Sequence, residues 1–100
     1  MNKITEITNN DNGNYVIDWF APWCGPCKII DGVLKNVKKE FPDINFKKIN
    51  VDENSDLANS FGIRSIPTLI FVKNNKIVET LIGVVNEEKL KETITELLLR

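Results

Sequence analysis

Apolar and polar residues follow two different periods along the chain, and these periods predict its strands and helices. Residues 15–20 are apolar at nearly every position, which is typical of a strand buried on both faces. Between residues 26 and 41 the apolar residues recur as they do on one face of a helix. Gly32 lies inside this predicted helix and allows a local bend. The predicted inward positions of the helix are Ile29, Ile30, Val33, Leu34, Val37 and Phe41.

The order of the elements predicts an α/β fold built on one mixed sheet. A strand, a helix and a strand joined by short connections form a right-handed crossover with two parallel strands. Asn74-Asn75 joins the next two strands in a tight antiparallel hairpin, and Gly62 ends the helix before them. Helices are expected on both faces of the sheet, in one domain over residues 1–100. The predicted elements are a short strand or ordered arm at 3–8, strands at 15–20, 44–51, 68–72 and 77–82, and helices at 26–41, at about 55–61 and after the capping residue Asn86.

The composition narrows the class of protein. The 100 residues carry 13 basic and 14 acidic side chains, and no basic block marks a surface for nucleic acid. No apolar run is long enough to cross a membrane, and residues 1–5 lack the apolar core of a signal peptide. We therefore expect a cytoplasmic protein that binds neither nucleic acid nor membrane, and we expect it to be a monomer.

The two cysteines of the chain, Cys24 and Cys27, lie between a predicted strand and the start of a predicted helix. Residues three apart in the first turn of a helix are neighbours, close enough to form a disulfide. The free amides and the positive end of the helix dipole favour an anion there. The Cys24 thiol is therefore expected to be exposed and acidified towards the thiolate that attacks disulfides. Gly25 and Pro26 suit the turn into the helix, and Cys27, deeper in the helix, is the expected resolving thiol.

Asp18 is the charged residue of the strand at 15–20. By the alternation of a strand it shares a face with Val16 and Phe20, and both faces are apolar. Desolvation is therefore expected to raise the pKa of Asp18. Two interpretations stay open, a paired structural carboxylate or a group that handles protons, and the position just before the cysteines favours the second. Lys48, taken alone, is interpreted as a solvated surface lysine.

Three stretches of the chain resemble the thioredoxin family, over a region from about Tyr15 to the C-terminus. Residues 21–28, Ala-Pro-Trp-Cys-Gly-Pro-Cys-Lys, are similar to the family's active-site signature with the Gly-Pro dipeptide of its reducing members. Residues 62–68, Gly-Ile-Arg-Ser-Ile-Pro-Thr, are similar to the loop that carries the family's cis-proline, and Gly83 follows the last strand. The resemblance implies the thioredoxin fold and the activity of a thiol-disulfide oxidoreductase.

The resemblance also implies a role for each matching residue. Cys24 corresponds to the attacking cysteine and Cys27 to the resolving cysteine. Asp18 corresponds to the buried carboxylate that takes or relays the proton of the second thiol, and Lys48 to the lysine near that carboxylate. Pro67 corresponds to the cis-proline that faces the disulfide. These five are the expected catalytic residues, and no metal site is expected.

A flat apolar rim around the disulfide, which would dock varied proteins, is a further implication of the resemblance. A cis-proline would turn the backbone of Ile66 towards the sulfurs, where it can pair with an extended substrate. Trp23 lies next to Cys24 and is expected to be exposed rather than packed in a core. The expected rim consists of Trp23, Gly25, Pro26, Ile66, Pro67, Ile82, Gly83 and Val84.

The leading interpretation is a general protein-disulfide reductase that cycles between dithiol and disulfide at Cys24 and Cys27. In the family a flavin- and NADPH-dependent thioredoxin reductase restores the dithiol, so this enzyme and disulfide-bonded proteins are the expected partners. The chain itself has no glycine-rich dinucleotide loop, and we expect it to bind neither cofactor.

Three other interpretations stay open. Oxidases and isomerases of the family tend to carry a histidine before the second cysteine, where this chain has Pro26, and the chain has no histidine at all. A zinc site would lack ligands, because one cysteine pair supplies only two of the four that zinc takes. A non-catalytic interaction subunit would use the apolar rim to hold another protein, with the dithiol incidental.

The chain departs from the family pattern at three places. The stretch before Tyr15 is short, so the first helix of the fold is expected to be shortened or absent. Gly32 stands where many members have a proline that kinks the helix. Trp19-Phe20 reverses the usual Phe-Trp order after the buried aspartate, which affects the packing of rings below the active site.

Overall fold

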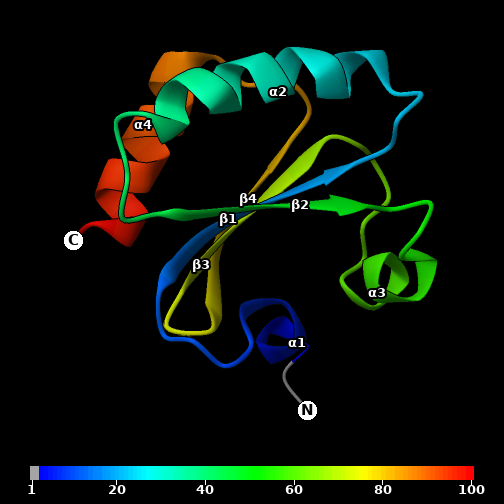
Figure 1. The fold of residues 1–100 in the computed structure, drawn as a ribbon, viewed down its shortest axis with the longest axis horizontal. Coiled ribbons are helices and arrows are strands. Elements are labelled where there is room, and N and C mark those ends of the chain that lie inside the picture. The colour runs from blue at the N-terminus through cyan, green and yellow to red at the C-terminus, as the bar shows by residue number, and fades with distance from the viewer. Residues whose placement is uncertain (1–2) are drawn as a thin grey trace.

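A four-stranded mixed sheet lies at the centre of the computed structural model, which describes residues 3–100 (Figure 1). In sheet order the strands are β2 (Asn45–Asn50), β1 (Asn14–Phe20), β3 (Thr68–Lys73) and β4 (Lys76–Ile82). β1 and β2 run parallel, while β3 pairs antiparallel with both β1 and β4. The parallel crossover and the antiparallel hairpin predicted from the sequence are therefore confirmed.

Helices cover both faces of the sheet, as Figure 1 shows. On one face lie α2 (Gly25–Lys38) and α4 (Glu87–Thr93), and on the other lie α1 (Ile4–Thr8) and α3 (Ser55–Ser60). A π-helical turn, η1 (Ile94–Leu98), continues α4. Within residues 3–100, no helix has the length and apolar character needed to span a membrane.

The side chains of β1 point alternately to the two faces of the sheet, and an apolar cluster of the core lies on each face. Val16 belongs to the cluster beneath α2 and α4, where it packs with Leu34. Ile17 and Trp19 belong to the cluster on the face of α1 and α3. Asp18 lies on the same face as Val16, and both line a pocket beside α2. The two-faced burial predicted for this strand is confirmed.

The N-terminal segment is a short helix, so its interpretation as a strand or an arm was wrong. Ile4 and Ile7 are three residues apart and are both buried. A helix puts such a pair on one side, whereas a strand would point the two side chains to opposite faces. The Thr8 hydroxyl donates a hydrogen bond to Asn75 Oδ1, which ties α1 to the hairpin turn. Residues 1–2, which belong to the stretch expected to contain no signal peptide, lie outside the described residues.

The long helix α2 departs from the predicted pattern at one inward position and at its end. It ends at Lys38 rather than at Phe41, and it runs through Gly32 without a break. Ile29 was expected to face inwards, but its side chain is 60% exposed. The buried side of α2 carries Ile30 and Leu34, and Ile29 is rotated by about 100° from Ile30 around the helix.

The connections that follow β2 have the backbone geometry that their residues predict. Gly62 adopts a φ of 69° just after α3, in the left-handed region that glycine tolerates. Asn74 and Asn75 adopt φ values of 52° and 61°, as a two-residue turn between twisted strands requires. Asn86 caps α4, since its side-chain oxygen accepts a hydrogen bond from the Lys89 N–H at 2.8 Å.

Candidate active site

Cys24 and Cys27 form a disulfide at the start of α2, with their Cα atoms 5.3 Å apart. Cys24 is the N-cap residue: its backbone is extended, and the helix begins at the next residue, Gly25. The backbone N–H of Cys27 donates a hydrogen bond to Cys24 Sγ over 3.1 Å. Such an N–H in the first turn has no carbonyl partner within the helix. In the reduced state it would favour a thiolate on Cys24, as the helix dipole would.

The cysteine pair is buried in the disulfide form, and each residue is only 4% exposed. The sequence predicted an exposed Cys24, and this prediction is wrong for the disulfide form because apolar neighbours cover the pair. These neighbours are Phe20, Ala21, Val51 and Ile66. A target disulfide must therefore approach over this apolar surface.

Asp18 is a buried and unpaired carboxylate in the middle of β1. The residue is 2% exposed, and within residues 3–100 neither of its oxygens has a hydrogen-bond partner. The pKa of Asp18 is raised to about 6, mainly because burial disfavours the charged form. The nearby Lys48 ammonium group lowers this pKa, and the Asp31 carboxylate raises it. The predicted effect of desolvation is confirmed. A carboxylate with this pKa can exchange a proton near neutral pH, which a paired structural carboxylate could not.

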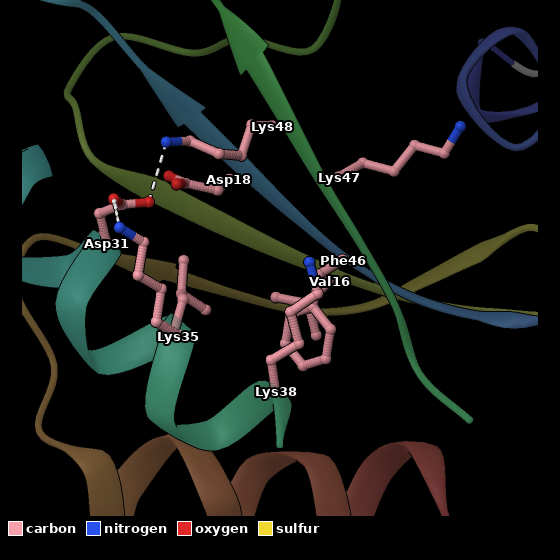
Figure 2. A pocket seen from close by; sticks show the side chains of 9 residues that line it. Val16, Asp18, Asp31, Lys35, Lys38, Phe46, Lys47 and Lys48 are labelled. Carbon is pink, nitrogen blue, oxygen red and sulfur yellow. Dashed lines mark hydrogen bonds and ion pairs between the residues drawn. The ribbon is translucent and has the colours of Figure 1, made fainter. Parts of the chain in front are cut away.

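Lys48 lies beside Asp18 in the register of β1 and β2, but its ammonium group bonds elsewhere. Lys48 Nζ donates a hydrogen bond to Asp31 Oδ1 at 2.8 Å and lies 4.6 Å from the centre of the Phe20 ring. Figure 2 shows the lysine side chain extending over Asp18 towards Asp31. Lys48 is therefore near the buried carboxylate, as the resemblance implied, and not simply a solvated surface lysine.

Asp31 was not among the residues predicted for the site. It lies one helical turn after Cys27 on α2 and pairs with Lys35 as well as Lys48. It lines a pocket of about 300 Å³ that also contains Asp18, and a second pocket of about 180 Å³ that contains Cys27. The signal available in the sequence was its i, i+4 spacing from a cysteine, which places two side chains on one helix face.

The loop before β3 brings Pro67 and Ile66 to the cysteine pair. The Ile66–Pro67 peptide bond is cis, as the resemblance implied. Ile66 packs against the cysteine cluster. The Pro67 carbonyl accepts a hydrogen bond from the Gly83 N–H at 2.8 Å, which holds this loop beside the end of β4.

The predicted rim is exposed at most of its positions. Trp23 is 71% exposed, as expected, and its indole Nε1–H donates a hydrogen bond to Asp52 Oδ2 at 2.9 Å. Pro67 is buried and so is not part of the open surface, because β3 begins at the next residue and draws it into the fold. The exposed members of the rim are Trp23, Gly25, Pro26, Ile82 and Val84, while Ile66 and Gly83 are half-buried.

Comparison with known proteins agrees with this geometry. The thioredoxin family model matches residues 2–96. Thioredoxin from Buchnera aphidicola is 36% identical over 96% of this chain and 97% of its own length, and thioredoxin from Bacillus subtilis is 42% identical over 84% and 82%. The structure of Fasciola hepatica thioredoxin matches with a TM-score of 0.80 at 40% identity, covering 91% of this chain and 86% of that one. Oxidised mitochondrial thioredoxin 3 from Saccharomyces cerevisiae matches with a TM-score of 0.84 at 33% identity, covering 97% and 92%.

A disulfide at the N-terminus of the long helix of this mixed α/β fold defines a thiol-disulfide oxidoreductase. The chain belongs to the thioredoxin family. Members of this family are protein-disulfide reductases, and the chain has the cysteine pair that this activity requires.

Proposed function

We propose that the chain is a general reductase of protein disulfides in which Cys24 is the nucleophile. The Cys24 thiolate attacks one sulfur of a target disulfide, a mixed disulfide forms, and the other target sulfur leaves as a thiolate. Cys27 then gives its proton to the Asp18 carboxylate, and the Cys27 thiolate attacks Cys24 Sγ. The Cys24–Cys27 bond forms and the second target sulfur leaves. Two electrons pass to the target, whose sulfurs take up protons from water and from Asp18.

The hydrogen bond from the Cys27 N–H to Cys24 Sγ supports this assignment more than any other observation. Cys24 is the N-cap of α2 and receives the donor, whereas Cys27 lies within the first turn and supplies it. Negative charge on sulfur is therefore favoured at Cys24. Cys27 lines a small pocket together with Asp31 and Lys48, on the side of α2 that faces the sheet.

The surface around the disulfide supports proteins as the targets. Trp23 and Ile82 offer large exposed apolar side chains, which suit the docking of varied partners. Ile66 lies against the cysteine cluster and leads into the cis-proline. Its backbone is the proposed contact for an extended segment of the target.

A thioredoxin reductase is the proposed electron donor, and it would take electrons from NADPH through a flavin. The chain itself needs no bound cofactor in this cycle, because both electrons reside on its two sulfurs. The Gly25-Pro26 dipeptide matches the reducing members of the family and supports the role of an electron donor to disulfides. Such a role fits the cytoplasm, where thiols are kept reduced, and this is the proposed location.

Reduction of insulin tests the proposal. With dithiothreitol, or with NADPH and a thioredoxin reductase, we expect insulin to precipitate much faster than with the reductant alone. Cys24→Ser should reduce the rate to background. Cys27→Ser should accumulate mixed disulfides with target proteins, visible on non-reducing gels, because the resolving thiol is gone. A wild-type rate no higher than the reductant background would contradict the proposal.

A further inference from the structure

Two charged side chains, Asp31 and Lys48, are shared by the pocket at the disulfide and the pocket at the buried carboxylate. Both line the pocket that contains Cys27, and both line the pocket that contains Asp18. Asp31 comes from α2, one turn after Cys27, and Lys48 comes from β2, directly beside Asp18 in the sheet register. Any change in how these two side chains pair therefore changes the field at Asp18.

Lys48 has two carboxylates within its reach and bonds only one of them. Asp18 is its neighbour across the strands, yet both Asp18 oxygens lack a hydrogen-bond partner within residues 3–100. Lys48 Nζ instead bonds Asp31 Oδ1 at 2.8 Å (Figure 2). The same Nζ lies 4.6 Å from the centre of the Phe20 ring. The Asp31 side chain is 29% exposed, so this pair avoids most of the desolvation that a pair with the buried Asp18 would require.

We infer that Asp31 is a positioning residue for the disulfide chemistry: it holds the Lys48 ammonium group away from Asp18 and so keeps the buried carboxylate free to accept the proton of Cys27. The inference rests on the proposed function, in which Asp18 takes that proton. A direct pair between Lys48 and Asp18 would stabilise the ionised carboxylate and make it a weaker base.

The other charged groups around Asp18 agree with this arrangement. Lys35 lies near the second oxygen of Asp31 at 3.6 Å, so Asp31 attracts a lysine from α2 as well as one from β2. β3 places the apolar Leu69 opposite Asp18. Asp31 raises the pKa of Asp18 and Lys48 lowers it. Removing Asp31 and releasing Lys48 towards Asp18 would therefore both lower the pKa of Asp18. The charged residues that line the pocket with Asp18 are Asp31, Lys35 and Lys38 of α2 and Lys47 and Lys48 of β2.

The ionisation of Asp18, followed by NMR of its carboxyl carbon in the oxidised protein, tests the inference without any measure of activity. We expect Asp31→Asn and Asp31→Ala to lower the pKa of Asp18 by roughly 1 unit, as one cation at short range does. The alanine variant favours the helix and so guards against a folding defect. Asp31→Glu keeps the charge and should keep the wild-type titration. Asp43→Asn, which removes an exposed carboxylate outside the pocket, should leave the titration unchanged.

Lys48→Met separates an action through Lys48 from a direct effect of the Asp31 charge. The variant alone should raise the pKa of Asp18, and Asp31→Asn added to it should cause a much smaller decrease than in the wild type. Equal decreases in the two backgrounds, or no decrease in either Asp31 variant, would overturn the inference. Neither result would affect insulin reduction by the wild type, so the proposed function and this inference can fail separately.

Discussion

At the scale of single residues, Asp18 stands out because its carboxyl group is buried in the core and finds no hydrogen-bond partner among residues 3–100. Its pKa in the folded state is about 6, against an ordinary value of 3.8. The folded state therefore binds this proton more tightly than the unfolded state does. Protonation of Asp18 therefore stabilises the folded state in full below about pH 4, and this stabilisation is lost as the pH rises through about 6.

Asp18→Asn removes this ionisation and should change how stability depends on pH. We expect the unfolding free energy of the variant, relative to the wild type, to increase by about 2–3 kcal/mol between about pH 4 and about pH 7.5. Urea unfolding at the two pH values measures this change. A difference that stays constant with pH would show that the folded state does not hold the Asp18 proton more tightly.

Trp23 is a residue whose substitution should affect docking more than folding. The residue is 71% exposed, and its indole N–H donates a hydrogen bond to Asp52. Trp23→Ala should therefore lower the unfolding free energy by about 1 kcal/mol or less, while kcat/KM for insulin reduction falls severalfold because an apolar anchor is lost. Leu99→Ala, which truncates another exposed apolar residue outside the proposed rim, serves as the control and should change neither quantity much. Equal kcat/KM values for the two variants would remove Trp23 from the docking surface.

The roles of residues could be predicted from the sequence where they follow from neighbouring positions in the chain. A role that depends on which side chain forms an ion pair with which could not be predicted. Cys24 and Cys27 follow from their spacing at a helix start, and the raised pKa of Asp18 follows from its apolar strand. Asp31 was missed because its importance depends on which carboxylate Lys48 bonds. That choice depends on the path of a long side chain across three elements.

At the scale of elements, α2 contains a glycine that its geometry does not need. Gly32 lies in the helix interior, is exposed, and a Cβ added there would meet no atom within 4 Å. Gly32→Ala should therefore raise the unfolding free energy by about 1 kcal/mol, because alanine loses less backbone freedom on folding. Chemical unfolding measures the gain.

Gly83 provides the matched control for that substitution. A Cβ at Gly83 also meets no atom within 4 Å, but its φ is +87°, a conformation that alanine adopts only with strain. Gly83→Ala should therefore destabilise the protein. If both alanine variants were stabilising, open space rather than backbone conformation would explain the effect.

Two elements differ from their predictions, and each for its own reason. The segment 3–8 has only Ile4 and Ile7 as apolar residues, too few to separate a helix from a strand until the sheet shows where they are buried. In α2 the apolar pattern is wider than the buried face, and Ile29 lies at its outer border. The longer apolar pattern in the rest of α2 and the Asn74-Asn75 turn of the hairpin were predicted correctly.

At the scale of the whole molecule, the two faces of the sheet have separate tasks. α2 carries the disulfide on one face, while α1 and α3 close the apolar cluster on the other. Ile4 is buried in that second cluster. Ile4→Ala should lower the unfolding free energy by about 2–4 kcal/mol through the cavity it leaves.

The same variant should retain the wild-type rate of insulin reduction per folded molecule, because Ile4 lies in a cluster that does not include the cysteines. The rate is measured at a low temperature at which the variant stays folded, and circular dichroism checks the folded fraction. A large loss of rate in the folded variant would mean that the N-terminal helix shapes the active site.

β2 lies at an edge of the sheet, and this position gives Lys48 a second role. Among residues 3–100 only β1 pairs with this strand, so its other side is a free edge of the sheet. Lys47 and Lys48 are both exposed at the centre of β2, and charged side chains there discourage another molecule from joining the sheet edge to edge. Replacing Lys48, the lysine that Asp31 holds, is therefore expected to weaken the barrier against fibril growth as well as to shift the pKa of Asp18.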